Sequence, residues 1–173
     1  MVIENKCNLT EQQLEFIEYV NTSRSIPWYY QEATSENYMF YGHTLMDRPL
    51  FGRPISGKIC SPHYQIAEDI VKQFCINNDI KFERVLRACI NATHYFDAPH
   101  SEIHIDHPFE HKNFVLYLNQ FSKGETYIFD KDNNIIHTIV PEKFKAVVFD
   151  GQPHAVASPA PNERRLILIV TFV

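Results

Sequence analysis

The spacing of apolar residues changes from helical to short alternating runs near Phe82, and this change constrains the fold most. Two helix-like segments precede it, and eight short apolar segments, separated by turns such as Asp132-Asn-Asn and Asp150-Gly151, follow it. The eight segments are Val85–Phe96, Glu102–Asp106, Asn113–Leu118, Thr126–Phe129, Ile135–Ile139, Lys145–Phe149, Ala155–Ser158 and Arg165–Phe172. This order predicts an α+β fold, a double-stranded β-helix (a jelly-roll or cupin-like barrel) with N-terminal helices packed on one sheet.

Both helices have recognisable start signals. Thr10 followed three residues later by Gln13 is a capping-box pattern. Ser61-Pro62 combines an N-cap residue with a proline suited to the first helical position, and this second helix is expected to end at Asn77. Apolar residues at helical spacing follow the first start, at Leu14, Ile17 and Val20. We expect both helices to cover the same face of the sheet.

Length and composition indicate an ordinary globular chain. Its 173 residues suggest one domain, and hydrophobic and charged fractions of 45% and 21% are typical of soluble proteins. A net charge of −5 gives no general nucleic-acid footprint. No apolar run reaches the roughly 18 residues of a membrane span, and no cleavable signal pattern is seen. Four scattered cysteines, expected to be reduced in a cytoplasmic protein, are Cys7, Cys60, Cys75 and Cys89.

A histidine and an aspartate stand two residues apart within the run Ser101–Pro108, at His104 and Asp106. In an extended segment their side chains would point to the same face, because strand side chains alternate. An imidazole nitrogen and a carboxylate oxygen could then bind one metal ion. A second histidine would complete the 2-His-1-carboxylate set that is typical of non-haem Fe(II) oxygenases.

His154, far along the chain in the run Asp-Gly-Gln-Pro-His-Ala-Val, is the predicted third ligand. Arg164 and Arg165 follow it and open the last apolar run. A planar guanidinium there could bind a carboxylate with two parallel hydrogen bonds. Adjacent strand residues face opposite sides, so only one of these two arginines can point inward.

The chain has other histidines that could be considered as metal ligands. His107 follows Asp106 directly and should point to the opposite face, while His111 falls in an expected loop and His100 precedes the strand. We expect these three to be surface or substrate-side histidines. His94 and His137 have no partner at metal-ligand spacing, and His43 is expected to be a buried or surface histidine rather than a ligand. Aromatic residues in Ile26–Tyr30 fit either a core or a substrate cleft.

An ordered set of motifs carries a resemblance to a known family. The motifs are His104-x-Asp106, Phe114–Asn119, Gly124-Glu125, Pro141, Val148–Asp150, His154 and Arg164-Arg165. Over roughly residues 84–173 this set resembles the catalytic core of the 2-oxoglutarate- and Fe(II)-dependent dioxygenases. It is most similar to the prolyl-hydroxylase-like branch and to small phage-encoded members, and Ile26–Tyr30 also looks like the phage members.

The resemblance implies a co-substrate site. In prolyl-hydroxylase-like members a tyrosine before Leu-Asn contacts the distal carboxylate of 2-oxoglutarate, and Tyr117 matches it here. The basic partner is expected at Arg165, counted back from the last strand, whereas spacing after the histidine favours Arg164. Asn91 could add a polar contact to the co-substrate or to metal-bound water, or be an ordinary strand residue. Ile167 replaces the small hydroxylic residue that many relatives carry.

The resemblance therefore implies one domain over residues 1–173, with residues 1–83 as helical and substrate-side support and residues 84–173 as the catalytic core. It implies Fe(II), 2-oxoglutarate and O2, with release of succinate and CO2 as an unidentified substrate is hydroxylated. An amino-acid or peptidyl side chain is the leading candidate; a nucleobase or metabolite also fits. A phage-encoded enzyme would act in the host cytoplasm. The alternative is a non-catalytic metal-binding jelly-roll module.

Overall fold

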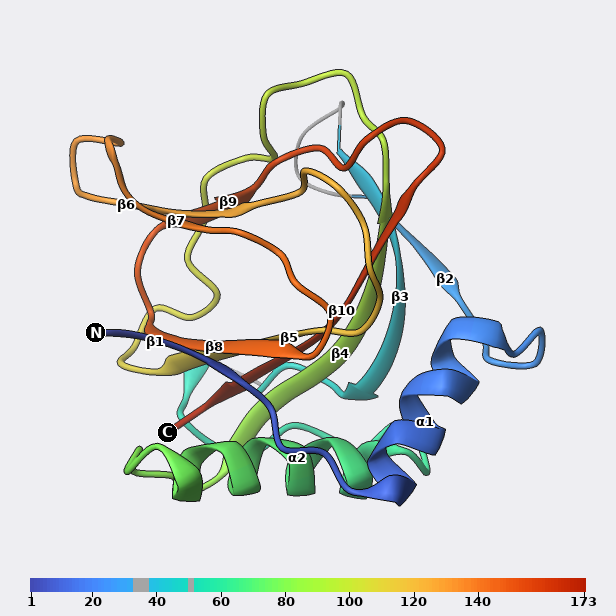
Figure 1. The fold of residues 1–173 in the computed structure, drawn as a ribbon. Helices are drawn as coiled ribbons and strands as arrows, with labels where there is room; N and C mark the ends of the chain where they lie inside the picture. Colours follow the sequence, from blue (N-terminus) through green and yellow to red (C-terminus); the bar gives the residue numbers. More distant parts are fainter. Residues whose placement is uncertain (33–37, 50–51) are drawn as a thin grey trace.

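The computed structural model describes residues 1–32, 38–49 and 52–173, and in them two antiparallel sheets face each other (Figure 1). The larger sheet has seven strands in the order β1-β8-β5-β10-β4-β3-β2, and the smaller has three in the order β7-β6-β9. The elements in chain order are β1 (Val2–Lys6), α1 (Glu11–Thr22), β2 (Tyr29–Glu32), β3 (Met39–Met46), α2 (Tyr64–Asn77), β4 (Val85–His94), β5 (Lys112–Tyr117), β6 (Thr126–Phe129), β7 (Ile135–Ile139), β8 (Lys145–Asp150), β9 (His154–Val156) and β10 (Arg164–Phe172).

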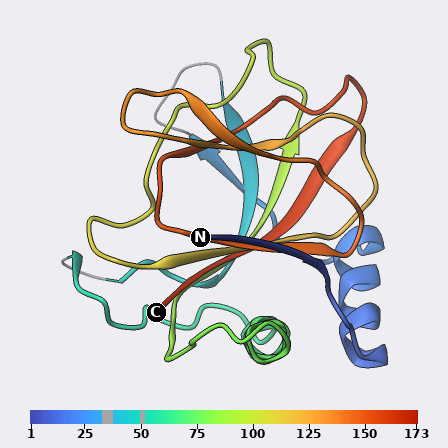
Figure 2. The ribbon, with the colours of Figure 1, turned by 60° about the vertical axis from the view of Figure 1, so that its left-hand side comes forward.

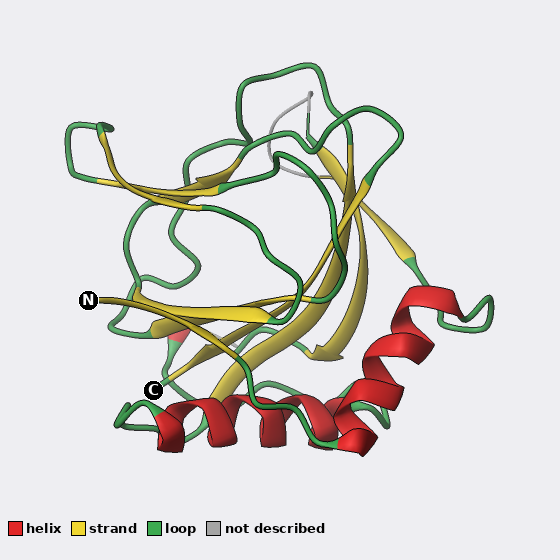
Figure 3. Ribbon diagram, viewed as in Figure 1, coloured by secondary structure: helices red, strands yellow, loops and turns green. Residues whose placement is uncertain are grey.

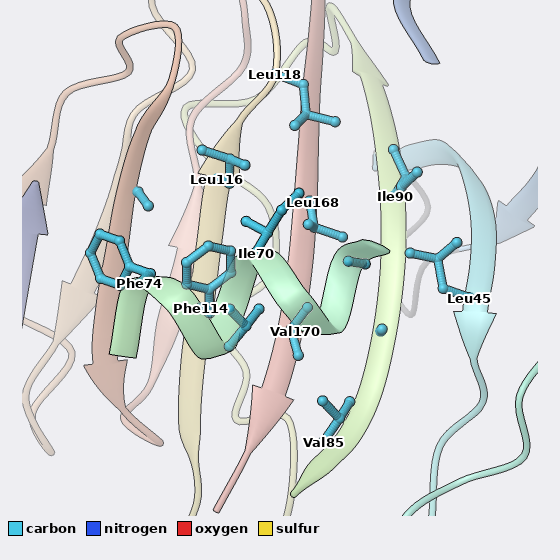
Figure 4. Close-up of a cluster of buried hydrophobic side chains, with 14 of the residues drawn as sticks. Leu45, Ile70, Phe74, Val85, Ile90, Phe114, Leu116, Leu118, Leu168 and Val170 are labelled. Carbon is cyan, nitrogen blue, oxygen red and sulfur yellow. The ribbon is translucent and has the colours of Figure 1, made fainter. Parts of the chain in front are cut away.

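Both helices cover the outer face of the larger sheet, away from the smaller one (Figures 2 and 3). Phe74 of α2 packs on Phe114 of β5, with ring centroids 5.5 Å apart. Alternate residues of the central strands supply the rest of this core, including Ile90, Leu116, Leu168 and Val170 (Figure 4). The expectation that the two helices share one sheet face is confirmed.

The opposite face of the same strands looks toward the smaller sheet. In β10, the strand between β4 and β5, Leu166 and Leu168 face the helices while Arg165 and Ile167 face the smaller sheet. This division follows from the two-residue repeat of a strand. A second, smaller apolar cluster fills one part of the space between the sheets. The other part is a cavity lined by both polar and apolar side chains, so β10 separates a helix-covered core from the candidate site.

The first helix begins as its sequence predicts. The Thr10 side chain accepts a hydrogen bond from the Gln13 amide at 3.3 Å, and the Gln13 side chain accepts one from the Thr10 amide at 2.9 Å. The buried stripe differs in one respect: Phe16 is buried, whereas Leu14 is exposed. The predicted start of the second helix was wrong, because the N-cap position of α2 is His63 rather than Ser61. The His63 side chain makes no capping hydrogen bond.

Replacing Thr10 with alanine removes the hydroxyl that accepts from the Gln13 amide, whereas the backbone amide of residue 10 can still donate to the Gln13 side chain. We expect the free energy of unfolding to fall by about 1 kcal/mol. Thr22→Ala is a matched control at the other end of the helix, because this exposed hydroxyl bonds only to the Glu18 carbonyl. Urea titrations followed by circular dichroism would measure both, and equal losses would contradict a specific role for the cap.

Most of the predicted strands are confirmed to within a few residues, with three differences. The stretch Glu102–Asp106 is not a regular strand; within it only His104 forms a bridge, to His154. The sequence analysis missed β1, an edge strand on β8, and β2, an edge strand on β3. Edge strands need only one partner and one covered face, so their apolar pattern is weak.

Two further expectations can be compared with the described part of the chain. The cysteines, Cys7, Cys60, Cys75 and Cys89, form no disulfide, as the sequence predicted. None of the described helices is both long and apolar enough to cross a membrane.

Candidate active site

Backbone pairing brings together the two histidines predicted as metal ligands. His104 lies in the loop between β4 and β5, and His154 is the first residue of β9. Each backbone amide donates to the other's carbonyl, at 3.1 Å and 3.0 Å. Asp106 completes a group whose three ligand atoms all lie within 4.8 Å of one another. The three side chains therefore converge as expected, through one bridge rather than through a strand.

The hydrogen bonds of the two imidazoles fix which nitrogen faces the group. Nδ1 of His104 lies 3.1 Å from the Glu102 carbonyl, and Nδ1 of His154 lies 2.9 Å from the Gln152 carbonyl. A carbonyl oxygen only accepts, so each Nδ1 carries the proton and each Nε2 keeps its lone pair. This orientation by a backbone carbonyl is typical of metal-binding histidines.

The Asp106 carboxylate is buried and lies between positive groups. Its Oδ2 is 3.5 Å from Nε2 of His154, while its Oδ1 accepts from Arg87 at 3.3 Å and from Arg48 at 3.4 Å. Burial would raise the pKa of this carboxyl, but the neighbouring imidazole and guanidinium groups outweigh burial and hold that pKa well below its usual range. Asp106 is therefore an anion at neutral pH, as a metal ligand must be.

The sequence analysis did not identify these two arginines. Arg87 lies on β4, and Arg48 follows β3 and also donates to the Asp106 backbone carbonyl at 2.8 Å. Strand alternation could have identified Arg87. It lies four residues before Asn91 on the same strand, so both side chains point to the same face of the sheet. Nothing in the sequence around Arg48 indicates a contact so distant along the chain.

A cavity of about 300 Å³ lies beside the three-residue group. Its walls come from both sheets, from the loop that carries His104 and from the segment after β3. On β4, β5 and β10 the lining residues are alternate ones, whose side chains point to the same face of the larger sheet. They include Arg87, Asn91, Asn113, Val115, Arg165, Ile167 and Ile169. Thr126 and Phe149 line it as well. The cavity therefore lies between the two sheets.

Arg165 points into the space between the sheets, and Arg164 does not. Arg165 is 3% exposed; its Nε donates to the Gly124 carbonyl at 3.1 Å and its Nη2 to Thr126 Oγ1 at 2.9 Å. No carboxylate of the described residues forms an ion pair with it. Arg164 is partly exposed and donates to the Asn21 carbonyl at 3.0 Å. The predicted inward orientation of Arg165 is thus confirmed.

Tyr117 is fully buried beside Arg165, whose guanidinium carbon lies 5.7 Å from the tyrosine ring centre. Its hydroxyl lies 3.1 Å from Thr126 Oγ1. Burial raises the pKa of Tyr117 more than the nearby guanidinium lowers it, so the phenol keeps its proton at neutral pH. Thr126, which the sequence analysis did not single out, connects the tyrosine and the arginine at the cavity wall.

Asn91 and Ile167 both line the cavity and are paired across β4 and β10. The side-chain oxygen of Asn91 accepts from the Cys89 thiol at 2.8 Å. Its polarity is therefore partly satisfied within the protein.

The other histidines lie outside the three-residue group. His107 and His111 are buried, which corrects the expectation of surface positions. Nε2 of His107 bonds to Thr171 Oγ1 at 2.8 Å, and Nδ1 of His111 to the Phe109 carbonyl at 2.7 Å. His100 is half-buried and bonds to the Ser101 carbonyl at 2.7 Å.

The aromatic residues that line the cavity are not those of Ile26–Tyr30, which the sequence offered as candidates for a substrate cleft. Tyr29 and Tyr30 are exposed, and Trp28 packs against the helix-covered core. Tyr38 and Phe40 line the cavity instead. Residues 33–37 and 50–51, part of the region 1–83 that was expected to give helical and substrate-side support, lie outside the described residues.

Gly151 permits the turn that leads from β8 to His154. A Cβ atom at this position would lie 2.3 Å from the His111 ring, so Gly151→Ala should lower the free energy of unfolding by about 1–3 kcal/mol. The matched control is Gly42→Ala, where the nearest neighbour of a Cβ, in the Gln31 side chain, is 3.4 Å away. Urea unfolding would compare them; equal stability of the two variants would show that the His111 ring moves aside freely.

Comparison with solved structures places this architecture among the folds of 2OG-Fe(II) oxygenases and prolyl hydroxylases. No protein-family model matches the sequence, and no curated protein matches it. The likeness is thus one of fold, over 99% of the chain.

Three solved structures illustrate it. A 2OG-Fe(II) oxygenase-family oxidoreductase from Burkholderia pseudomallei superposes with a TM-score of 0.75 at 15% identity, over 84% of its own chain. A prolyl-4-hydroxylase from Pseudomonas putida gives 0.61 at 15% identity, over 91% of its chain. A Trichoplax adhaerens prolyl hydroxylase, in complex with a hypoxia-inducible-factor peptide fragment, gives 0.64 at 12% identity, over 82% of its chain. Each match covers 99% of the present chain.

Proposed function

We propose that this chain is a single-domain Fe(II)- and 2-oxoglutarate-dependent oxygenase built on a double-stranded β-helix. The reaction would convert a substrate C–H bond, 2-oxoglutarate and O2 into the hydroxylated substrate, succinate and CO2. The observation that carries the proposal is the convergence of two Nε2 atoms and one carboxylate at a cavity that also contains the buried guanidinium of Arg165, which forms no ion pair with any described carboxylate. The similar folds of known 2OG-Fe(II) oxygenases support it.

The metal would be held by His104, Asp106 and His154. Two neutral imidazoles and one carboxylate fit the 2-His-1-carboxylate set, which suits Fe(II) and leaves coordination positions open. Bound Fe(II) would supply the redox chemistry of oxygen activation. The protein keeps both imidazoles in the required tautomer through the Glu102 and Gln152 carbonyls.

The distal carboxylate of 2-oxoglutarate would bind Arg165. A buried guanidinium with only neutral partners is unfavourable unless an anion reaches it, and a carboxylate matches its planar fork. Thr126 and Tyr117 would assist, because the Thr126 hydroxyl lies at the cavity wall and the Tyr117 hydroxyl lies 3.1 Å from it. Ile167 and Val115 would exclude water from the chain of the co-substrate. Asn91 would give a polar contact near the middle of the cavity.

An amino-acid or peptidyl side chain is the substrate class that we favour. The hydroxylase from Trichoplax adhaerens, which shares the fold, was solved with a peptide fragment. Segments at residues 25–62, which bring Tyr38, Phe40 and Arg48 to the cavity, and at residues 108–112 would determine substrate choice.

The test is to add Fe(II) and then 2-oxoglutarate to the protein without oxygen and to record the visible spectrum. We expect a weak charge-transfer band, followed by succinate formation when oxygen is admitted. Absence of both the band and succinate, in protein that still binds the metal, would favour a non-catalytic metal-binding module.

A further inference from the structure

Three arginines contact the cavity, and they are divided between its two ends. Arg165 pairs with Thr93, near one end of β4, whereas Arg87 is opposite Thr171, six residues further along β10. This separation is about 20 Å of strand. Arg48 lies beside Arg87, since both donate to the same oxygen of Asp106. One co-substrate bound at Arg165 therefore leaves the Arg48–Arg87 pair without a ligand of its own.

The charge of this pair is only partly balanced. Two guanidiniums share one carboxylate oxygen, at 3.3 Å and 3.4 Å, which are long hydrogen bonds. The same carboxylate would also neutralise the metal. Arg48 also donates to the backbone carbonyl of Asp106, which carries no charge. Within the described ranges neither guanidinium forms an ion pair with any other carboxylate, so the two positive charges share a single carboxylate.

A buried amide at the same end also lacks partners. Asn113 of β5 lines the cavity and is 1% exposed, yet neither its Nδ2 nor its Oδ1 has a hydrogen-bond partner in the part of the chain that the structure describes. Arg87 and Asn113 are both opposite Thr171, one on each side of β10, so they belong to one row across the sheet. Buried polar groups without partners are rare and unfavourable, which indicates that a polar ligand completes this row.

Resting on the proposed function, we infer that Arg48 and Arg87 bind a carboxylate group of the prime substrate and that Asn113 gives it a further hydrogen bond. A planar guanidinium fork recognises a carboxylate by two parallel bonds. The cavity of about 300 Å³ must also hold 2-oxoglutarate, so the part of the substrate that enters is small. The substrate class is thus a small carboxylic acid, of which a free amino acid is one example, rather than the interior of a peptide or a neutral metabolite.

The experiment is a binding measurement on protein loaded with Zn(II), a redox-silent substitute for Fe(II), and 2-oxoglutarate. The probes are the standard L-amino acids, simple carboxylic acids, the carboxamides of both, and inorganic phosphate, each followed by saturation-transfer NMR and calorimetry. We expect at least one acid to bind, and its carboxamide to bind on the order of 100-fold more weakly, as for loss of one member of a buried charge pair.

Variants assign the effect to residues. Arg87→Gln and Arg48→Gln should weaken binding of that acid by on the order of 100-fold while zinc affinity changes much less. Arg53→Gln, an exposed arginine in the same segment as Arg48, is the matched control and should bind the acid normally. Asn113→Ala should give a smaller loss.

Several results would overturn the inference. Equal binding of acids and carboxamides would show that the carboxylate is not recognised, and binding of phosphate alone would show a different anion. Arginine variants that lose zinc in proportion to the acid would show that the pair only positions Asp106. If no acid binds although zinc and 2-oxoglutarate do, the substrate class is wrong and the proposed function stands. If zinc and 2-oxoglutarate themselves fail to bind, the proposed function fails first.

Discussion

Asp106→Ala is expected to abolish succinate formation and to remove most of the affinity for Fe(II) or Mn(II). The variant loses the only carboxylate of the three-residue group, and it leaves Arg48 and Arg87 facing the metal position without their shared anion. Two uncompensated cations would repel a divalent ion in addition to the lost bond. Calorimetric titration with Mn(II) and a succinate assay would measure both effects. His154→Ala should behave similarly.

The matched control is Asp97→Ala, an exposed aspartate in the same loop. It should keep wild-type metal affinity and turnover, because surface substitutions away from such features usually have small effects. Circular dichroism would show that Asp106→Ala remains folded. Wild-type metal binding by a folded Asp106→Ala protein would exclude Asp106 from the metal site.

Arg165→Ala should raise the apparent KM for 2-oxoglutarate by roughly two orders of magnitude, whereas metal affinity without co-substrate should hardly change. The loss corresponds to the ~2–5 kcal/mol typical of truncating one member of a buried charge pair. Of the neighbouring Arg164 and Arg165, Arg165 is the buried one, and it lies against Thr126 and Tyr117. The measurement is a 2-oxoglutarate titration read as succinate.

Arg164→Ala is the neighbouring control. Its guanidinium bonds to the Asn21 carbonyl at the end of α1, outside the cavity, so its kinetics should be nearly normal. A large effect at Arg164 with none at Arg165 would mean that the register of β10 is shifted by one residue. No effect at either would exclude this region as the co-substrate site.

Local patterns predicted much of this structure because the physics behind them is local. The Thr10 capping box needs only four consecutive residues, and the inward orientation of Arg165 follows from strand alternation counted along β10. His104, Asp106 and His154 could be proposed as one group because the chemistry of metal binding limits which residue types can be ligands; the backbone bridge brings the two histidines together. Each of these predictions required only spacing and residue chemistry.

What the sequence did not predict depends on contacts that have no local pattern. The Arg48–Asp106 pair joins a segment after β3 to the loop before β5, and its cause is charge rather than periodicity. His107 was expected on the face opposite Asp106 and His111 in a loop, yet both are buried. His107 contacts Thr171, and Nδ1 of His111 contacts the Phe109 carbonyl, whereas Nε2 of His111 has no hydrogen-bond partner among the described residues. Ser61 looked like a helix cap, but its hydroxyl accepts from the His63 amide and contacts His43 instead.

His104 and His154 are joined by two reciprocal backbone hydrogen bonds, so their two amides report together on local opening of the site. Either amide can exchange its hydrogen with solvent only when the other carbonyl moves away. An ion held by both imidazoles would have to be released before the bridge separates. Hydrogen–deuterium exchange at these two amides should then slow together as the ion is added, by a factor set by its concentration relative to its dissociation constant, while the amides of central β10 keep their rates.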